Sequence, residues 1–291
     1  MVAVLGDGVD HAHPDLDPGN RTRVIVGRNV VDENDNTLPD PGYNHETAIA
    51  GIIAAITNND PNSVAGVMWN AKILPVKVNS GQTAHHASAV EWARSHGAHI
   101  MNMSWNVDAD FMGEAFKDAI RNSYAQGIVL CASMGNDNNG TVRYPAALYG
   151  VIAVGGTNQL DDRWSTPTEG SNWGNHVSVV APATGYRTTT LGGGYAPDFG
   201  GTSLATPLVA GSAGLILSEG LDRGHSLTND DVRAILENTA DKVPGMQGNS
   251  WTNQYGYGRI NVGKAIQKLN LPYEVEQSSV TSSSATLTWG Y

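Results

Sequence analysis

Short runs of β-branched and apolar residues alternate along the chain with segments of helical periodicity, and this alternation constrains the fold most. It is typical of a parallel sheet that is covered on both faces. We therefore predict an α/β fold: a doubly wound, mostly parallel sheet with helices on both faces. The predicted strands are Val2–Leu5, Val24–Val26, Ile73–Val78, His99–Ser104, Ile128–Ala132, Val151–Val154 and Val177–Val180. The predicted helices are Thr47–Ile56, His86–Ser95, Phe111–Ala125, Ser203–Ser218 and Asp230–Thr239.

Two of these helices have informative sequences. Ser203–Ser218 is apolar almost throughout, so we expect it to be buried at the centre of the domain. Pro207 is compatible with its first turn, where a backbone N–H needs no intrahelical partner. The helix Asp230–Thr239 has Thr228 or Asn229 as its expected N-cap.

The chain divides into one large unit and a short tail. Residues 1–265 carry the alternating pattern, 266–273 are predicted to be a linker, and 274–291 are rich in Ser and Thr. The tail has the alternation of a short β-type segment, which suggests either the truncated start of a fibronectin type III-like domain or a disordered tail. Met1–Leu5 runs directly into a predicted core strand, so we expect that upstream segments of a longer protein are missing.

Composition excludes several classes of function. The formal net charge of −11 argues against a nucleic-acid or anionic-membrane partner, because phosphate surfaces recruit Lys and Arg. No run of about 18 uninterrupted apolar residues is present, so no membrane-spanning helix is expected. Cys131 is the single cysteine, which excludes an intrachain disulfide. We expect a monomer.

Three segments carry residue types suited to nucleophilic catalysis. Gly201–Gly211 places Ser203 at the start of the apolar helix, where the helix terminus stabilises an oxyanion. Asn44–Ala55 reads as a helix that opens at His45, and Ile128–Asn136 reads as a strand that ends in Gly-Asn. Taken alone, each has an ordinary structural explanation: an N-cap serine, a helix-start histidine and a turn asparagine.

Together, and in their order along the chain, the segments Asn44–Ala55, Ile128–Asn136 and Gly201–Gly211 resemble the histidine, oxyanion and serine motifs of the subtilisin-like serine peptidase family, the subtilases. The resemblance covers about Val2 to Ala265. It implies that Ser203 is the nucleophile, that His45 is the general base, and that Asn136 donates to the oxyanion. We expect Ser203 and His45 to lie within hydrogen-bond reach of each other.

The acid of the triad departs from the family pattern. The segment Val2–Leu16 resembles the aspartate motif of bacterial and kexin-like members, which often read Asp-Asp-Gly, but the first Asp is Gly6 here and Asp7 fills the second position. Successive residues of a strand face opposite ways, so Asp7 should point away from His45 unless a bulge turns it inward. Asp7 is therefore only a candidate acid. If Gly6 occupies the position of the missing acid, Gly6→Asp should raise turnover; if a bulge turns Asp7 inward, Gly6→Asp should add little or crowd the site.

The histidine motif departs from the family at two further positions. Glu46 replaces the usual glycine, and Ala48 replaces the usual second histidine. Neither change removes the base. A carboxylate next to His45 favours the imidazolium and would raise the pKa of the ring.

The resemblance also implies how substrate and metal would bind. The family adds an extended peptide or protein substrate as a strand beside segments that match Ser104, Trp105 and Asn106 on one side and Ser133 and Gly135 on the other. No cofactor is required for the chemistry. A structural Ca²⁺ is a candidate ligand of Asp15 and Asn58, in an oxygen-rich loop.

The sequence thus predicts a serine endopeptidase, extracellular as the resemblance implies. The alternative is a catalytically impaired or dead homologue that retains the peptide groove as a binding module, and Gly6 is the feature that favours it.

Overall fold

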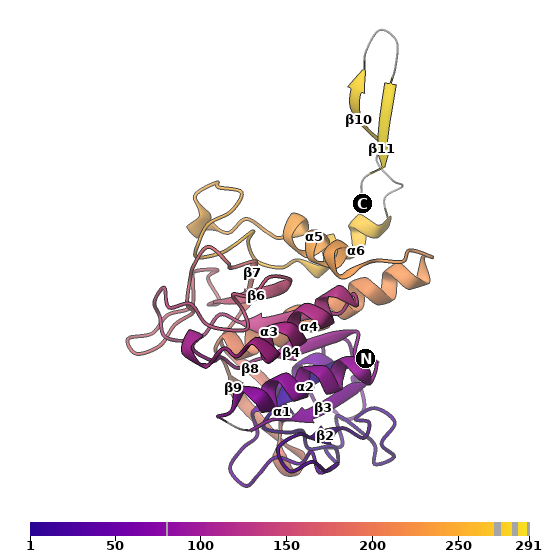
Figure 1. Cartoon of the computed structure of the whole chain (residues 1–291), viewed down its shortest axis with the longest axis vertical. Helices are drawn as coiled ribbons and strands as arrows, with labels where there is room; N and C mark the ends of the chain where they lie inside the picture. The colour runs from indigo at the N-terminus through magenta and orange to yellow at the C-terminus, as the bar shows by residue number, and fades with distance from the viewer. Residues whose placement is uncertain (80, 271–274, 281–284, 290–291) are drawn as a thin grey trace.

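A sheet of seven parallel strands forms the centre of the computed structural model, which describes residues 1–79, 81–270, 275–280 and 285–289 (Figure 1). The strand order is β2-β3-β1-β4-β5-β6-β7, so β1 lies inside the sheet and the chain winds outward on both sides of it. The predicted α/β fold is confirmed. The strands are β1 (Val2–Gly6), β2 (Arg28–Asn29), β3 (Ile73–Lys77), β4 (Ile100–Met103), β5 (Val129–Ser133), β6 (Val151–Thr157) and β7 (Val179–Pro182).

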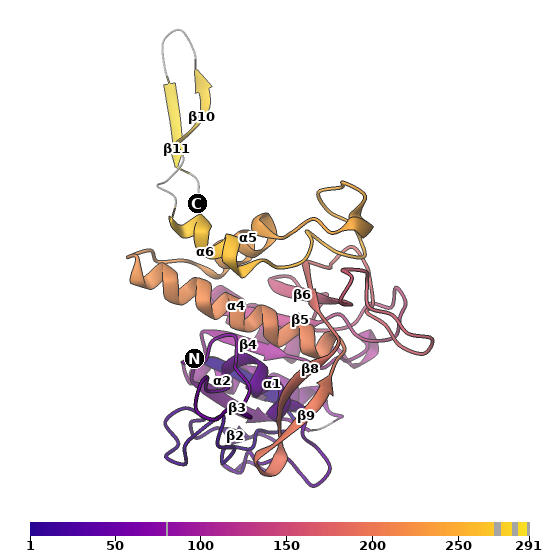
Figure 2. The ribbon, with the colours of Figure 1, turned by 180° about the vertical axis from the view of Figure 1, so that it is seen from behind.

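Helices cover both faces of the sheet because the side chains of each strand alternate between them. In β1, Val2 and Val4 pack on the face covered by α1 (His45–Ala54) and α4 (Thr202–Asp222). Ala3 and Leu5 pack on the opposite face, which is covered by α2 (Thr83–Ser95) and α3 (Glu114–Ala125). Figures 1 and 2 show the two layers from opposite sides.

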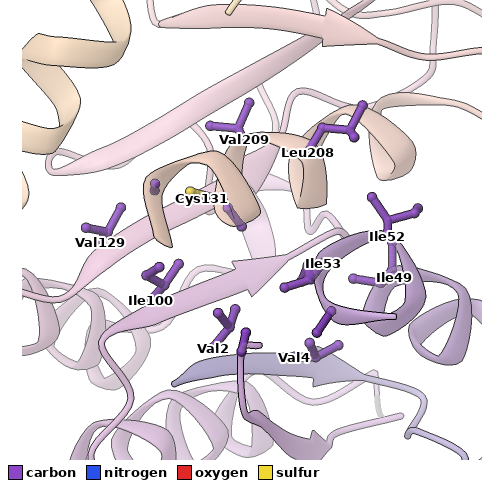
Figure 3. Packing of buried hydrophobic residues seen from close by; sticks show 14 of the residues in the cluster. Val2, Val4, Ile49, Ile52, Ile53, Ile100, Val129, Cys131, Leu208 and Val209 are labelled. Carbon is purple, nitrogen blue, oxygen red and sulfur yellow. The ribbon is translucent and has the colours of Figure 1, made fainter. Parts of the chain in front are cut away.

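The helix α4 runs through the middle of the molecule, as its sequence predicts. Figure 3 shows Leu208 and Val209 of α4 above β5, with Ile49 and Ile53 of α1 beside them. By length and composition alone, α4 could cross a membrane, but 72% of its most apolar window is buried inside the protein.

The remaining elements surround this core. A hairpin of β8 (Tyr186–Thr190) and β9 (Gly194–Phe199) lies next to α1 and leads directly into α4 (Figure 2). The helix α5 (Asn229–Thr239) is capped by Thr228, whose side chain accepts the backbone N–H of Asp231 in a capping box. The other segments are α6 (Val262–Asn270) and the 3₁₀ turns η1 (Ala109–Phe111), η2 (Leu191–Gly193) and η3 (Pro244–Met246).

Two sequence predictions need correction. Val24–Val26 is not a strand, since Val24 makes only an isolated bridge to Ile73. Ile73 bonds the oxygen of Arg23 and the N–H of Ile25 on either side of this bridge, while the N–H groups of Arg23 and Val24 donate to the Asp17 carboxylate. Residues 266–270 of the predicted linker at 266–273 are helical, because α6 continues to Asn270 and packs Ile266 against the core, and 271–273 lie outside the described residues.

The last described strands form a separate hairpin. β10 (Val275–Val280) and β11 (Ala285–Trp289) pair antiparallel, and Figure 1 shows them projecting away from the layered core. The interpretation of 274–291 as the start of a fibronectin type III-like domain stays a prediction.

Candidate active site

The candidate catalytic side chains come from strand ends and helix starts at one edge of the sheet. β1, β4 and β5 end at Gly6, Met103 and Ser133, while α1 begins at His45 and α4 begins at Thr202. In open α/β sheets the carboxyl ends of the strands are where ligands bind. The helices α1 and α4 pack against each other on the same face, so their first turns lie side by side.

Ser203 lies in the first turn of α4, half-buried, with its side chain near the end of β4. Gly201 precedes this turn with φ of +84°, a left-handed conformation that favours glycine. The hydroxyl of Ser203 donates to the backbone oxygen of Ser104 at 3.2 Å. Within the described part of the chain, no hydrogen bond joins this hydroxyl to the His45 ring, so the predicted contact is not formed in this geometry. Catalytic hydrogen bonds often align only when substrate binds.

Pro207 has a different role from the one predicted. It is the sixth residue of α4 rather than part of the first turn, and it leaves the carbonyl of Ser203 without an intrahelical N–H partner. The hydroxyl of Ser104 occupies that position and lies 3.3 Å from the Ser203 oxygen. Asn102 donates in turn to the Ser104 hydroxyl at 2.9 Å. A buried chain of hydrogen bonds therefore links β4 to the residue that carries the candidate nucleophile.

Asn136 follows β5, and its amide is held in one orientation. Its Oδ1 accepts the backbone N–H of Thr202 at 3.0 Å and the Thr202 hydroxyl at 2.6 Å. Since the oxygen faces Thr202, the NH₂ group is the end of the amide that remains to donate. It borders an open hollow of about 450 Å³, which is also lined by Phe199 and Gly201.

His45 is the first residue of α1, and a carboxylate holds its ring. Nδ1 lies 2.9 Å from Oε1 of Glu46, and the ring packs 5.7 Å from that of Phe199, centroid to centroid. The His45 side chain is 35% exposed, whereas that of Glu46 is 4% exposed. With Nδ1 donating to Glu46, Nε2 is the nitrogen that can act as a base.

The candidate acid Asp7 contacts the helix rather than the ring. Its carboxylate oxygens accept the backbone N–H groups of His45 and Glu46, each at 3.0 Å. The N-cap residue Asn44 makes no side-chain capping bond, so Asp7 supplies the cap from the end of β1. The structure thus places Glu46, and not Asp7, in contact with the His45 ring.

Position 6 is not simply an empty acid position. A Cβ atom built on Gly6 would lie 2.1 Å from Oε1 of Glu46 and 2.2 Å from its Cδ. The carboxyl group of Glu46 therefore occupies the space that a side chain at position 6 would enter. The expectation that Gly6→Asp raises turnover is corrected, because the new side chain would collide with Glu46.

The electrostatics of this group follow from burial and from the close carboxylates. Burial alone lowers the pKa of His45, but the charge and hydrogen bond of Glu46, with the charge of Asp7, raise it above its ordinary value. Burial opposes ionisation of Glu46, yet the His45 contact holds the pKa of Glu46 below its usual range. Burial, followed by contact with Glu46, raises the pKa of Asp7 to about 8.

The predicted substrate-binding residues lie on two neighbouring segments. Ser104, Trp105 and Asn106 follow β4, and Ser133 and Gly135 lie at and after the end of β5. The side chain of Asn106 links the segments, since its Nδ2 donates to the Ser133 oxygen at 2.6 Å. This bond occupies space between them where a glycine at 106 would leave an opening.

Of the two predicted Ca²⁺ ligands, Asp15 is hydrogen-bonded within the protein and Asn58 is exposed. Asp15 Oδ1 accepts from the Asn59 amide at 2.6 Å, and Oδ2 accepts the Val64 N–H at 2.9 Å. Both oxygens therefore face hydrogen-bond donors, while Asn58 is exposed and its neighbour makes the contact. Among the described residues, no group of three or more His, Cys, Asp or Glu side chains could hold a metal ion.

The sequence predicted that Glu46 would raise the pKa of His45, and the pKa is raised, but it was not predicted that Glu46 bonds the ring in place of the missing acid. A signal was present: Gly6 lacks the acid, and a new acid stands beside the base at position 46. The departure at Gly6 in the aspartate motif and the departure at Glu46 in the histidine motif could have been interpreted as one compensated change.

Comparison with known proteins identifies the family of the chain. Residues 1–258 match the Subtilase family. The chain is 37% identical over 269 residues to the thermophilic serine proteinase of Bacillus sp. (strain AK1), covering 91% of this chain and 61% of the relative. It is also 37% identical over 270 residues to thermitase from Thermoactinomyces vulgaris, with coverage of 91% and 88%.

Solved structures show the same fold. The prenylagaramide maturation protease PagA superposes with a TM-score of 0.74 at 27% identity, over 92% of this chain and 94% of that one. Fervidolysin from Fervidobacterium pennivorans, a keratinolytic enzyme related to subtilisin, superposes with a TM-score of 0.75 at 28% identity, over 91% of this chain and 42% of that one.

Proposed function

Because this chain belongs to the subtilase family of serine peptidases, we propose that it is a serine endopeptidase in which Ser203 is the nucleophile and His45 the general base. One observation carries the proposal most strongly. Thr202, one residue before Ser203, holds Asn136 through its Oδ1, which leaves the Asn136 NH₂ as the donating end of the amide beside the N-terminus of α4. An amide donor next to a helix N-terminus that carries a serine supports an oxyanion hole beside its nucleophile.

The reaction follows from these groups. Rotation of the Ser203 side chain away from Ser104 lets Oγ attack the substrate carbonyl carbon while its proton moves to His45 Nε2. Asn136 Nδ2 and the N-terminus of α4 stabilise the resulting oxyanion. The C–N bond then breaks, and His45 returns the proton to the leaving amine. Water attacks the acyl carbon and gives a proton to His45; the bond from that carbon to Ser203 Oγ then breaks, Oγ takes the proton back from His45, and the carboxyl product leaves.

The substrate side of the proposal rests on the segments after β4 and β5. We propose that an extended peptide lies along Ser104–Asn106 and Ser133–Gly135, with Asn106 narrowing the first side-chain pocket. The net charge of −11 supports a peptide rather than a nucleic acid as the ligand. We further propose that the protein is an extracellular monomer and that its chemistry needs no cofactor. Asp15 and Asn58 remain the candidate ligands of a structural Ca²⁺.

Labelling with a fluorophosphonate probe tests the nucleophile without knowledge of the substrate. We expect the wild-type protein to be labelled once, and Ser203→Ala and His45→Ala to lose the label. Ser88→Ala, which alters an exposed serine on α2, is the matched control and should label as the wild type does. Labelling that survives Ser203→Ala would exclude Ser203 as the nucleophile.

The second candidate function is a peptide-binding module without turnover. The glycine at position 6 is the observation that favours it, because the acid of the family motif is missing there. The same labelling experiment separates the two. A folded wild-type protein that neither labels nor cleaves casein, but binds an unstructured peptide, would support the module.

A further inference from the structure

The acid that orients the base in a serine peptidase must contact the ring nitrogen opposite the one that takes the proton. In this chain that contact is made by Glu46, whose Oε1 lies 2.9 Å from His45 Nδ1. A carboxylate that is only 4% exposed is costly unless it is paired, and Glu46 is paired on both oxygens. Its Oε2 accepts the backbone N–H of Asp7 at 2.8 Å.

Sequence adjacency does not explain this contact. Consecutive residues of a helix point in different directions, so a side chain at 46 does not ordinarily face the ring at 45. Here the Asp7 N–H draws the Glu46 carboxyl back beneath the histidine, at the end of β1. The absence of a side chain at Gly6 leaves the space that the carboxyl occupies, 2.1 Å from an ideal Cβ position.

We propose that Glu46 is the positioning residue for His45, so that the acid of the triad is supplied by helix α1 instead of strand β1. This inference rests on the proposed peptidase function. It explains two departures as one exchange, since a carboxylate at 46 requires a glycine at 6. It also removes the main reason for regarding the chain as a catalytically dead homologue.

The first test replaces Glu46 by Gln, which has almost the same shape. Gln accepts the Asp7 N–H through its oxygen and must then present its NH₂ to His45 Nδ1. Nδ1 becomes an acceptor and the proton moves to Nε2, the tautomer that cannot act as a base. We expect kcat on fluorogenic casein, and the rate of fluorophosphonate labelling, to fall roughly 10³–10⁴-fold with little change in KM.

A matched control keeps charge and helix position similar. Glu114 also lies in the first turn of a helix, α3, but its side chain is exposed. Glu114→Gln should leave kcat and KM unchanged. Circular dichroism should show that Glu46→Gln is folded at the assay temperature.

An exchange of positions tests the idea from the other side. Gly6→Asp alone should lower activity, since the added side chain meets Glu46. Gly6→Asp combined with Glu46→Gly returns a carboxylate to the strand and should raise kcat at least tenfold above that of Glu46→Gln.

The pH profile separates this positioning role from a purely structural role of Glu46, which would leave the acidic limb of the profile unchanged. If Glu46 orients and charges His45, the acidic limb of the kcat/KM profile should move to lower pH in Glu46→Gln, because the imidazolium loses its carboxylate. An active wild type with an unchanged kcat and acidic limb in Glu46→Gln would overturn this inference alone. A folded wild-type protein that neither cleaves casein nor reacts with the fluorophosphonate probe would overturn the proposed function and this inference with it.

Discussion

Asp7 and Glu46 bind each other reciprocally: the Asp7 N–H donates to Glu46 Oε2 at 2.8 Å, and the Glu46 N–H donates to Asp7 Oδ1 at 3.0 Å. These reciprocal bonds match those of a capping box, except that the two residues come from the end of a strand and the start of a helix. It joins β1 to α1 at the point where His45 begins the helix. The base is therefore held by tertiary contacts on both its backbone and its ring.

The first prediction concerns Asp7 and pH. Burial and then Glu46 raise the pKa of Asp7 from its ordinary 3.8 to about 8, so the native protein keeps a proton between these values that the unfolded chain has lost. Stability from this group is complete below about pH 4 and falls as pH rises to about 8. Asp7→Asn cannot titrate, so the wild type's advantage over it should shrink from pH 5 to pH 9, by on the order of a few kcal/mol.

Urea unfolding of both proteins at pH 5 and pH 9 measures this difference, in a Ser203→Ala background that prevents self-digestion. The raised pKa of His45 changes stability in the same direction and the lowered pKa of Glu46 in the opposite one. Because Asp7 contributes to both shifts, the measured difference includes the changes that Asp7→Asn makes in them. An advantage of the wild type that grows toward pH 9 would show that the Asp7 pKa is not raised.

The second prediction concerns the space at Gly6. In Gly6→Ala the new Cβ would lie 2.1 Å from Glu46 Oε1, so the carboxyl must leave the His45 ring. We expect kcat to fall at least tenfold and the melting temperature to drop. Gly81→Ala is the control, because a Cβ there meets open space.

The two positions should be coupled. In a Glu46→Gly background, Gly6→Ala should cost less than it does alone, because the group it collides with is gone and only the strain of a side chain at φ of +159° remains. Additive effects in this double-mutant cycle would mean that positions 6 and 46 do not share one space.

The fold was predictable because local sequence patterns identify its main helices and strands. The run of apolar residues in α4 and the alternating contacts of Val2 to Leu5 require burial on one or two faces, whatever the rest of the chain does. β2 was not predictable, since it is only Arg28–Asn29, while the apolar run Val24–Val26 makes a single isolated bridge to Ile73.

The candidate site was predictable only where motifs carry it. Ser203, His45 and Asn136 lie in segments whose order and spacing match a family. The Glu46–His45 contact depends on how the end of β1 meets the start of α1, and the i, i+1 spacing in the sequence argues against it. The role of Pro207 likewise needed the structure, because its freed carbonyl is bonded by Ser104, 99 positions away.

The third prediction concerns the amide of Asn136. Asn136→Asp keeps the oxygen that Thr202 contacts but replaces the NH₂ donor with a second oxygen, which would repel an oxyanion. In a subtilisin, loss of one such donor lowers kcat by roughly 10²–10³, and we expect at least this effect with KM little changed. Thr202→Val removes only the hydroxyl contact to Asn136, so its loss should be smaller. An Asn136→Asp protein with wild-type kcat would exclude Asn136 from the oxyanion hole.

The last prediction concerns the hydrogen bonds beneath the nucleophile. Ser104→Ala removes the hydroxyl that bonds the Ser203 carbonyl left open by Pro207, and it also leaves the buried Asn102 amide without this acceptor. Leaving buried polar groups unpaired costs about 1–3 kcal/mol. In a domain of this size, each kcal/mol lowers the melting temperature by about 2–4 °C.

The exposed Ser88→Ala should melt as the wild type does. The backbone oxygen of residue 104 remains in Ser104→Ala, so the acceptor of the Ser203 hydroxyl is kept and the labelling rate should fall far less than in Glu46→Gln. A melting temperature equal to that of the wild type would mean that Pro207, not Ser104, determines the geometry of this turn.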